Sequence, residues 1–156
     1  MMFSYRLVRL IEGHADELAA GLEVRVLGSS QVAHFRNVPG HELKERVYEI
    51  YRHLGEWLLG KNQQDIEHRY REIGERRAAQ GVPLSEVLEA IILTQENLWD
   101  FLKSEAVVDR AVEIMGELEL LQMLEWFFDR GMYYAAVGYE QEVERRTLEE
   151  EAAYAP

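Results

Sequence analysis

Apolar residues recur at spacings of three and four along nearly the whole chain, and no segment shows the strict alternation of apolar and polar residues that marks a half-buried strand. A period near 3.6 gathers apolar side chains on one side of an α-helix. The pattern therefore predicts an all-α protein, an antiparallel helical bundle with a long C-terminal helix. The predicted helical segments are residues 3–27, 41–60, 62–80, 83–102 and 107–150.

The first of these segments contains two signals for an interruption. Gly13 is a predicted kink, and Asp16 is placed to cap a second helical piece. Residues 29–40 follow without a helical period, and we predict a connecting loop there.

The sharpest predicted break lies at residues 80–83, Gln-Gly-Val-Pro. Gly81 is able to take the left-handed conformation that closes a helix, and Pro83 suits the first turn of the next one. Arg76 and Arg77 fall in the last turn before this break, where positive charge favours the exposed carbonyl groups. A connection this short predicts that the two helices are antiparallel neighbours.

The C-terminal segment has apolar residues that alternate by four and three, as in a heptad seam. An unbroken helix here would be roughly 60 Å long at 1.5 Å per residue, against about 30 Å for the earlier helices. Either it breaks near Gly116 or Gly131, or its end projects beyond the bundle. The predicted seam consists of Val107, Ala111, Ile114, Leu118, Leu121, Phe128, Met132, Ala135 and Tyr139.

Residues 118–137 are apolar on almost every side, so this stretch must be covered on all faces. It is either the central helix of the domain or a helix that packs on a second subunit. We predict a homodimer contact here and divide the chain into a helical domain, residues 1–140, and a charged helical tail or linker, residues 141–156. The predicted dimer contacts are Leu118, Leu121, Phe128, Met132 and Tyr139.

Charge and composition exclude several classes of function. The 156 residues carry a net charge of −12, which repels nucleic-acid phosphates and anionic lipid alike. The absence of cysteine excludes disulfides, thiol catalysis and cysteine-ligated zinc. Charged residues at Arg6, Arg9 and Glu12 interrupt any signal peptide, so we expect a cytoplasmic protein with no membrane segment.

Candidate chemistry is sparse. A di-iron bundle needs two Glu-x-x-His motifs, whereas the chain offers only Asp65 and His68 on a polar helix, so we expect no metal. His53 flanks a predicted buried seam and is the single candidate for a haem ligand; the alternative is a boundary histidine with a water or backbone partner.

Two polar residues fall on predicted apolar lines. Glu125 follows Leu121, and Gln95 lies between Ile91 and Leu98. Either these polar groups satisfy one another inside the bundle, or they line a small pocket that senses a ligand. No nucleophile with a supporting base and no phosphate loop is apparent, so we predict no catalytic residues and no enzyme activity.

The stretch "GERRAAQGVPLSEVLEAIILTQENLWDFL", residues 74–102, resembles the N-terminal sensory domain of RsbR/RsbRD-type co-antagonists of bacterial stress signalling. The matching positions are Arg77, Ala78, Gln80 and Gly81, and the similarity extends over residues 42–102. The resemblance implies a globin-like helical domain without haem or other cofactor, commonly a homodimer, that passes a signal to a fused output domain or a partner protein.

The leading hypothesis is therefore a non-enzymatic sensory or interaction domain. A haem or small-ligand sensor that uses His53, or Gln95 with Glu125, is the second hypothesis. A helical enzyme is the third.

Overall fold

The computed structural model describes residues 5–59, 63–105 and 111–155, and every regular element in these ranges is helical. The all-α prediction is thereby confirmed. The elements are α1 (Tyr5–Gly13), α2 (Ala15–Leu27), the 3₁₀ helix η1 (Ser30–Asn37), α3 (Gly40–Arg52), α4 (Leu54–Leu59), α5 (Gln63–Ala79), α6 (Leu84–Glu105) and α7 (Ala111–Tyr154).

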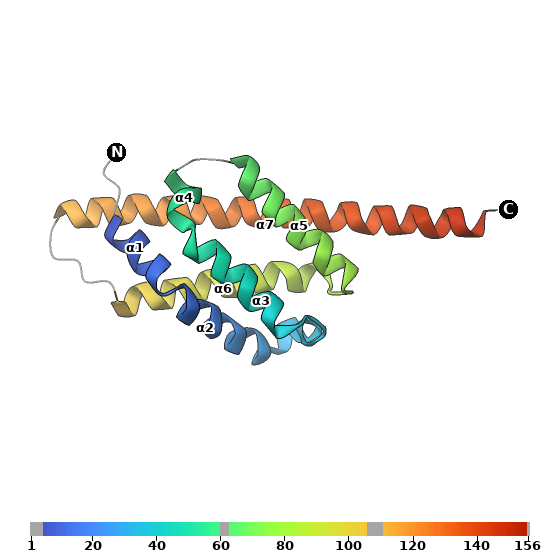
Figure 1. Cartoon of the computed structure of the whole chain (residues 1–156), viewed down its shortest axis with the longest axis horizontal. Coiled ribbons are helices and arrows are strands. Elements are labelled where there is room, and N and C mark those ends of the chain that lie inside the picture. Colours follow the sequence, from blue (N-terminus) through green and yellow to red (C-terminus); the bar gives the residue numbers. More distant parts are fainter. Residues whose placement is uncertain (1–4, 60–62, 106–110, 156) are drawn as a thin grey trace.

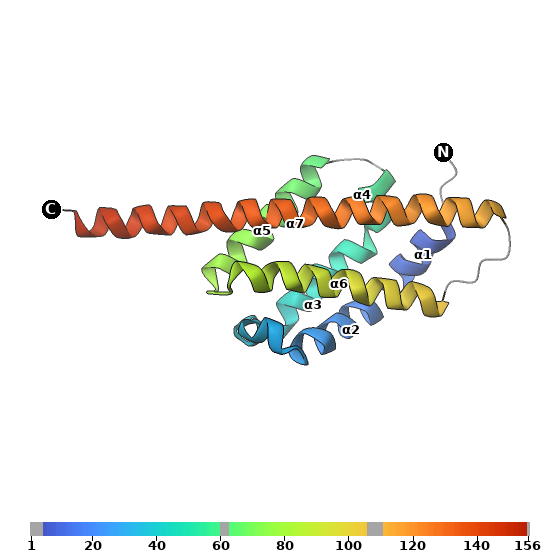
Figure 2. The same ribbon diagram turned by 180° about the vertical axis from the view of Figure 1, so that it is seen from behind.

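Helix α6 lies between α2 on one side and α7 on the other, and it runs antiparallel to α7 (Figures 1 and 2). Helices α2 and α3 pack against each other, with η1 at their end. Helix α5 crosses α7 obliquely, and this pair has the most extensive contact in the described part of the chain.

Every described element contributes to one apolar core. Its fully buried side chains interdigitate from α1 through α7, as expected for a single domain of this length. The largest of them are Ile11, Leu22, Val32, Tyr51, Leu54, Leu58, Ile66, Leu98, Leu120, Leu124, Phe127 and Phe128.

The first predicted helix is interrupted close to the predicted kink, at His14, whose φ of −113° and ψ of 22° lie outside the helical region. Its ring Nδ1 lies 2.8 Å from the carbonyl oxygen of Leu10, near the end of α1. Asp16 does not cap α2 but lies in its first turn, where its charge favours the positive end of the helix dipole. Residues 29–40, predicted as a loop, are largely the 3₁₀ helix η1, capped by Ser29.

The prediction of one helix over residues 41–60 is wrong. The chain breaks at His53, and α4 turns away from α3 to contact α1 and α7. At the start of α4 the backbone N–H of Gly55 donates to Oε2 of Glu12 on α1, 3.4 Å away. Buried Tyr51 and Leu54 keep helical spacing across the break, which is why the apolar pattern gave no sign of it.

The break after α5 is confirmed at Gly81, which has a φ of +77°. The N–H of Val82 donates to the carbonyl of Arg77 at 3.1 Å and closes the turn. The two helices diverge from it rather than lying along each other as predicted, because α5 leans across α7 (Figure 1).

Helix α7 is one continuous helix of 44 residues that passes Gly116 and Gly131 without a break, and its C-terminal end projects beyond the bundle (Figures 1 and 2). The predicted seam was only partly right. Val107 lies outside the described residues, and Leu118 is half exposed. Among residues 118–154, where the side chains of α7 are described, Phe128 and Ala135 of the predicted seam are buried. The buried face there consists of Leu120, Leu124, Phe127, Phe128, Gly131, Tyr134, Ala135 and Gly138. No helix in the described ranges combines the length and hydropathy needed to cross a membrane.

Candidate functional site

The arginine pair before the α5–α6 turn surrounds one buried carboxylate. Glu42, in the first turn of α3, is only 7% exposed. It accepts hydrogen bonds from Nη2 of Arg76 at 3.2 Å, from Nη1 of Arg77 at 2.8 Å and from Nε2 of Gln80 at 3.2 Å. Arg77 also donates to Oε1 of Gln80 at 2.8 Å. Three of the residues that close α5 thus bind the start of α3.

The charged groups in this cluster shift one another's pKa values. Burial by itself raises the pKa of Glu42, but the hydrogen bonds and charges of Arg76 and Arg77 outweigh it and lower the pKa to about 2. Burial lowers the pKa of Arg77, whereas its hydrogen bond to Glu42 and the charge of Glu42 raise it. Removing one partner would leave a buried charge uncompensated, so the cluster holds α3 firmly to the corner between α5 and α6.

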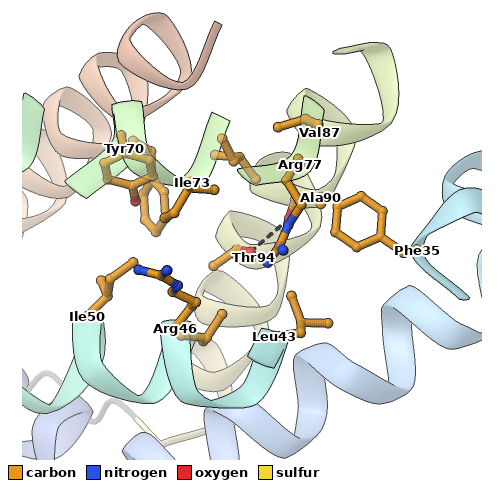
Figure 3. A pocket seen from close by; sticks show the side chains of 13 residues that line it. Phe35, Leu43, Arg46, Ile50, Tyr70, Ile73, Arg77, Val87, Ala90 and Thr94 are labelled. Atoms are coloured by element: carbon orange, nitrogen blue, oxygen red, sulfur yellow. Dashed lines mark hydrogen bonds between the residues drawn. The ribbon is translucent and has the colours of Figure 1, made fainter. Parts of the chain in front are cut away.

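Beside this cluster lies a partly open cavity of about 60 Å³ bordered by η1, α3, α5, α6 and α7 (Figure 3). Its wall is predominantly apolar, and the Arg77 guanidinium carbon lies 5.6 Å from the centre of the Phe35 ring at one edge. The lining residues are Phe35, Leu43, Arg46, Val47, Ile50, Tyr70, Ile73, Arg77, Val87, Ala90, Ile91, Thr94 and Phe128.

Four polar side chains border the cavity, and two of them already form hydrogen bonds with other residues. Arg77 binds Glu42, and the Thr94 hydroxyl donates to the Ala90 carbonyl at 2.7 Å. Arg46 has one loose ion pair, with 3.5 Å between its Nη2 and Oε1 of Glu72. The Tyr70 hydroxyl makes no hydrogen bond to any residue that the structure describes, although Tyr70 is only 3% exposed.

The predicted pair Gln95 and Glu125 is brought together at a second, wider depression of about 450 Å³ between α1, α6 and α7. Glu125 is exposed and Gln95 half-buried, and no hydrogen bond joins them. They therefore do not satisfy each other inside the bundle. The depression is lined by Leu7, Gln95, Trp99, Leu102, Lys103, Leu121 and Glu125.

His53 lies apart from both hollows. It ends α3 with a half-exposed ring, and its Nδ1 is 3.7 Å from Oε2 of Glu56. An axial haem ligand needs an apolar pocket over its ring, and His53 lines neither of the two hollows described, so neither hollow offers it a haem site. His68 and Asp65 lie on the exposed side of α5, and the described residues contain no cluster of three potential metal ligands.

Three glycines allow α5 and α7 to approach each other closely beside the cavity. A Cβ atom on Gly74 of α5 would lie 1.9 Å from the Ala135 carbonyl oxygen, and one on Gly138 of α7 would lie 2.2 Å from the Arg71 carbonyl oxygen. A Cβ atom on Gly131 would lie 2.6 Å from Cζ of Tyr70, which lines the cavity. The backbones of α5 and α7 therefore touch, with no side chain between them.

Sequence reasoning missed Glu42, Arg46, Tyr70 and this glycine contact. The one signal that pointed to the contact was the spacing of seven between Gly131 and Gly138, which places both on the same side of a helix. Nothing local marked Glu42 as the partner of Arg77, because the two are 35 positions apart.

A family model described as the RsbT co-antagonist protein rsbRD N-terminal domain matches residues 10–154. The globin-like helical fold of that family agrees with the all-α arrangement seen here. Separate comparisons with curated proteins and with solved structures gave no significant match. Because the family match spans nearly the whole chain, the protein belongs to the RsbT co-antagonist protein rsbRD N-terminal domain family.

Proposed function

We propose that this domain is a non-enzymatic sensory and protein-interaction module of bacterial stress signalling, which dimerises and passes its state to an output domain or partner protein in the cytoplasm. The observation that carries the proposal is the path of α7. Phe128 of this helix borders the cavity beside Arg77, and the same unbroken helix continues to Tyr154, beyond the bundle (Figure 1).

The contact between α5 and α7 supports a mechanical connection. The backbones of the two helices are in contact at Gly74 and Gly138, so one helix has little room to move without the other. A change in the cavity that displaces α5 would therefore shift or rotate α7, and the projecting end would move with it.

The tail beyond residue 140 has the features of a helical linker. Its side chains are mostly exposed, so bundle packing does not hold it in a helix. Instead Arg145 donates to Oε2 of Glu142 at 3.0 Å, and Arg146 donates to Oε1 of Glu142 at 2.9 Å, in pairs three and four residues apart. Such pairs stabilise a helix in water and suit a rigid extension.

The dimer contact is proposed on the outer face of α7. Trp126 is 40% and Tyr133 58% exposed, and their spacing of seven places them on the same side of the helix. Leu118 is 50% exposed nearby. Of the other contacts predicted from the sequence, Phe128 is 1% exposed, and the Tyr139 hydroxyl donates to the Val82 carbonyl within the protomer. We propose a second copy of the chain as the occupant because the family resemblance implies a homodimer and these exposed aromatic side chains lie on one side of a long helix.

Solution mass tests this assignment. Light scattering on the whole chain at micromolar concentration is expected to give twice the monomer mass, and the double variant Trp126→Ser with Tyr133→Ser is expected to give the monomer mass. Val24→Ser is the matched control, since Val24 is 72% exposed on α2, away from α7. A monomeric parent chain, or a double variant that stays dimeric, would contradict the proposed contact.

The position of the tails provides a second test. The chain has no cysteine, so Thr147→Cys introduces a single site for a spin label on the exposed tail. A dimer that delivers a signal to paired outputs predicts a defined label-to-label distance in pulsed electron resonance. The absence of dipolar coupling in a sample of dimeric mass would show that the tails point apart, and it would overturn the relay.

A further inference from the structure

We propose that the cavity bordered by Arg46, Tyr70 and Phe128 binds a short aliphatic carboxylate, whose charged group lies on the Arg46 guanidinium and whose hydrocarbon chain lies against the apolar wall. This inference deepens the proposed sensory function by naming the class of ligand. It rests on the size of the cavity, on its chemistry and on two polar groups that lack adequate partners.

The size of the cavity limits the ligand to a few heavy atoms. Its volume is about 60 Å³. An apolar cavity of roughly 150 Å³ holds benzene, and each water needs about 10–15 Å³. On this scale the cavity holds about two to three heavy atoms. The end of a short hydrocarbon chain therefore fills it, with the carboxylate at its partly open side on Arg46, whereas a long fatty acid requires the helices to separate.

Arg46 provides the group that recognises an anion. Its side chain is only 20% exposed, yet it makes no hydrogen bond to any described residue, and its nearest carboxylate oxygen is 3.5 Å away on half-exposed Glu72. A guanidinium has five N–H donors, and a largely buried one normally uses them. A carboxylate in the cavity would accept two of these donors in parallel.

The surrounding charges favour an anion over a cation. Arg76 and Arg77 share the single carboxylate of Glu42, while Arg46 has the loose pair with Glu72 and a weaker attraction to Glu49, which is bound to Arg69. The four guanidinium groups at this side of the cavity thus face three carboxylates. Burial is the largest cause of the lowered pKa of Arg77. The positive charges of Arg46 and Arg76 repel Arg77 and lower its pKa further.

Tyr70 offers a second hydrogen-bond donor. Burial raises the pKa of its hydroxyl, which therefore stays protonated at neutral pH. Figure 3 shows Arg46 extending from α3 toward Tyr70 and Ile73 of α5, so the two donors belong to different helices. A carboxylate bound to both would join α3 to α5.

The same residue transmits occupancy to α7, because the phenol end of Tyr70 lies against Gly131. A bound ligand would hold Tyr70 and Phe128 in one arrangement, and the ring of Phe127 on α7 packs edge-on against both of these rings. Ligand binding would then change the equilibrium between positions of the projecting helix.

The test is calorimetric and NMR titration of the whole chain at pH 7 with sodium butyrate. Three probes serve as comparisons: butyramide, which has the same size without charge; decanoate, which is too long; and chloride. Butyrate is expected to bind at millimolar concentration or below, at least tenfold more tightly than each of the three. No butyrate binding, or equal binding of butyramide, overturns the proposal, and tighter binding of decanoate overturns the size limit.

Variants locate the site. Arg46→Gln is expected to weaken butyrate binding at least tenfold, and Tyr70→Phe severalfold, whereas Arg36→Gln, on the exposed side of η1, should leave it unchanged. Ala90→Leu places extra carbons in the cavity and should abolish binding without removing a charge. Circular dichroism checks that each variant folds. If a variant does not fold, NMR shifts of the parent chain decide: perturbed amides must cluster around Arg46, Tyr70 and Thr94, and a cluster elsewhere refutes the site.

The outcome is separable from that of the dimer experiments. A monomeric chain that binds butyrate would retain this inference and overturn the dimer, and a dimeric chain without butyrate binding would do the reverse.

Discussion

Gly74 on α5 lies directly against the Ala135 carbonyl group on α7, so closely that a Cβ atom on Gly74 would be 1.9 Å from that oxygen. No side-chain rotation relieves this overlap, since both groups belong to helix backbones. The contact explains how a largely polar α5 packs tightly across the long C-terminal helix with a narrow apolar stripe.

Gly74→Ala is expected to destabilise the domain by about 1–3 kcal/mol, the usual range for overpacking, despite the better helix propensity of alanine. The midpoint of urea unfolding measures this effect. Gly13→Ala is the control, because a Cβ atom there meets nothing within 4 Å, and its stability should be unchanged or slightly higher. Equal stability of the two variants would contradict the backbone contact.

The pKa of Glu42 predicts how stability depends on pH. A carboxyl group with a folded pKa of about 2 and an unfolded value near 4.5 stabilises the fold above pH 4.5, and this contribution disappears as the pH falls from 4.5 toward 2. A shift of this size corresponds to about 2–4 kcal/mol. Glu42→Gln should thus be less stable than the parent at pH 7, and the difference should shrink by pH 3.

Urea unfolding at pH 7, 5 and 3 measures that difference. Glu142→Gln is the comparison: the pKa of Glu142 is also lowered to about 2, by Arg145 and Arg146, but its ion pairs lie on the tail, away from the core. Its effect on bundle unfolding should be small at every pH. A stability gap for Glu42→Gln that stays constant with pH would show that the carboxylate charge is not the cause.

Two leucines distinguish the buried face of α7 from the seam predicted by spacing alone. Leu124 is fully buried and Leu118 is 50% exposed. Leu124→Ala should cost about 2–5 kcal/mol of unfolding free energy, and Leu118→Ala less than about 1 kcal/mol in the monomer. Thermal unfolding at low protein concentration provides the comparison. A larger loss of unfolding free energy for Leu118→Ala than for Leu124→Ala would support the predicted seam.

The tail should be dispensable for the stability of the bundle. A chain that stops after residue 141 loses exposed residues whose ion pairs lie within α7 itself. Its melting temperature is expected to stay within a few degrees of the parent value, while the helical signal per molecule falls. A large drop in the melting temperature would mean that the tail packs on the bundle, and the boundary near residue 140 would be wrong.

A second contact joins α7 to the α5–α6 turn at Tyr139. The Tyr139 hydroxyl donates to the Val82 carbonyl at 2.6 Å, and Tyr139→Phe removes this bond alone. The expected loss is about 1 kcal/mol of unfolding free energy. Tyr133→Phe is the control, because that ring is 58% exposed. Equal loss in both variants would refute a specific role for the bond.

The sequence by itself determined the helical class, the turn at Gly81 and the presence of a long last helix. These features depend on interactions between residues a few positions apart: the period of apolar side chains and the left-handed backbone that glycine tolerates. The family resemblance came from the same region, residues 42–102, and the match over residues 10–154 confirmed it.

Only the tertiary structure decided which side of α7 is buried, where α3 ends, and which carboxylate binds Arg77. Residues 118–137 are apolar nearly all round, so several helix orientations satisfied the local pattern, and the approach of Gly74 to Ala135 selected one of them. Glu42 and Arg77 meet across 35 positions, and the cavity beside them takes its wall from five elements. Such contacts depend on how complete helices pack, and local periodicity carries no record of that packing.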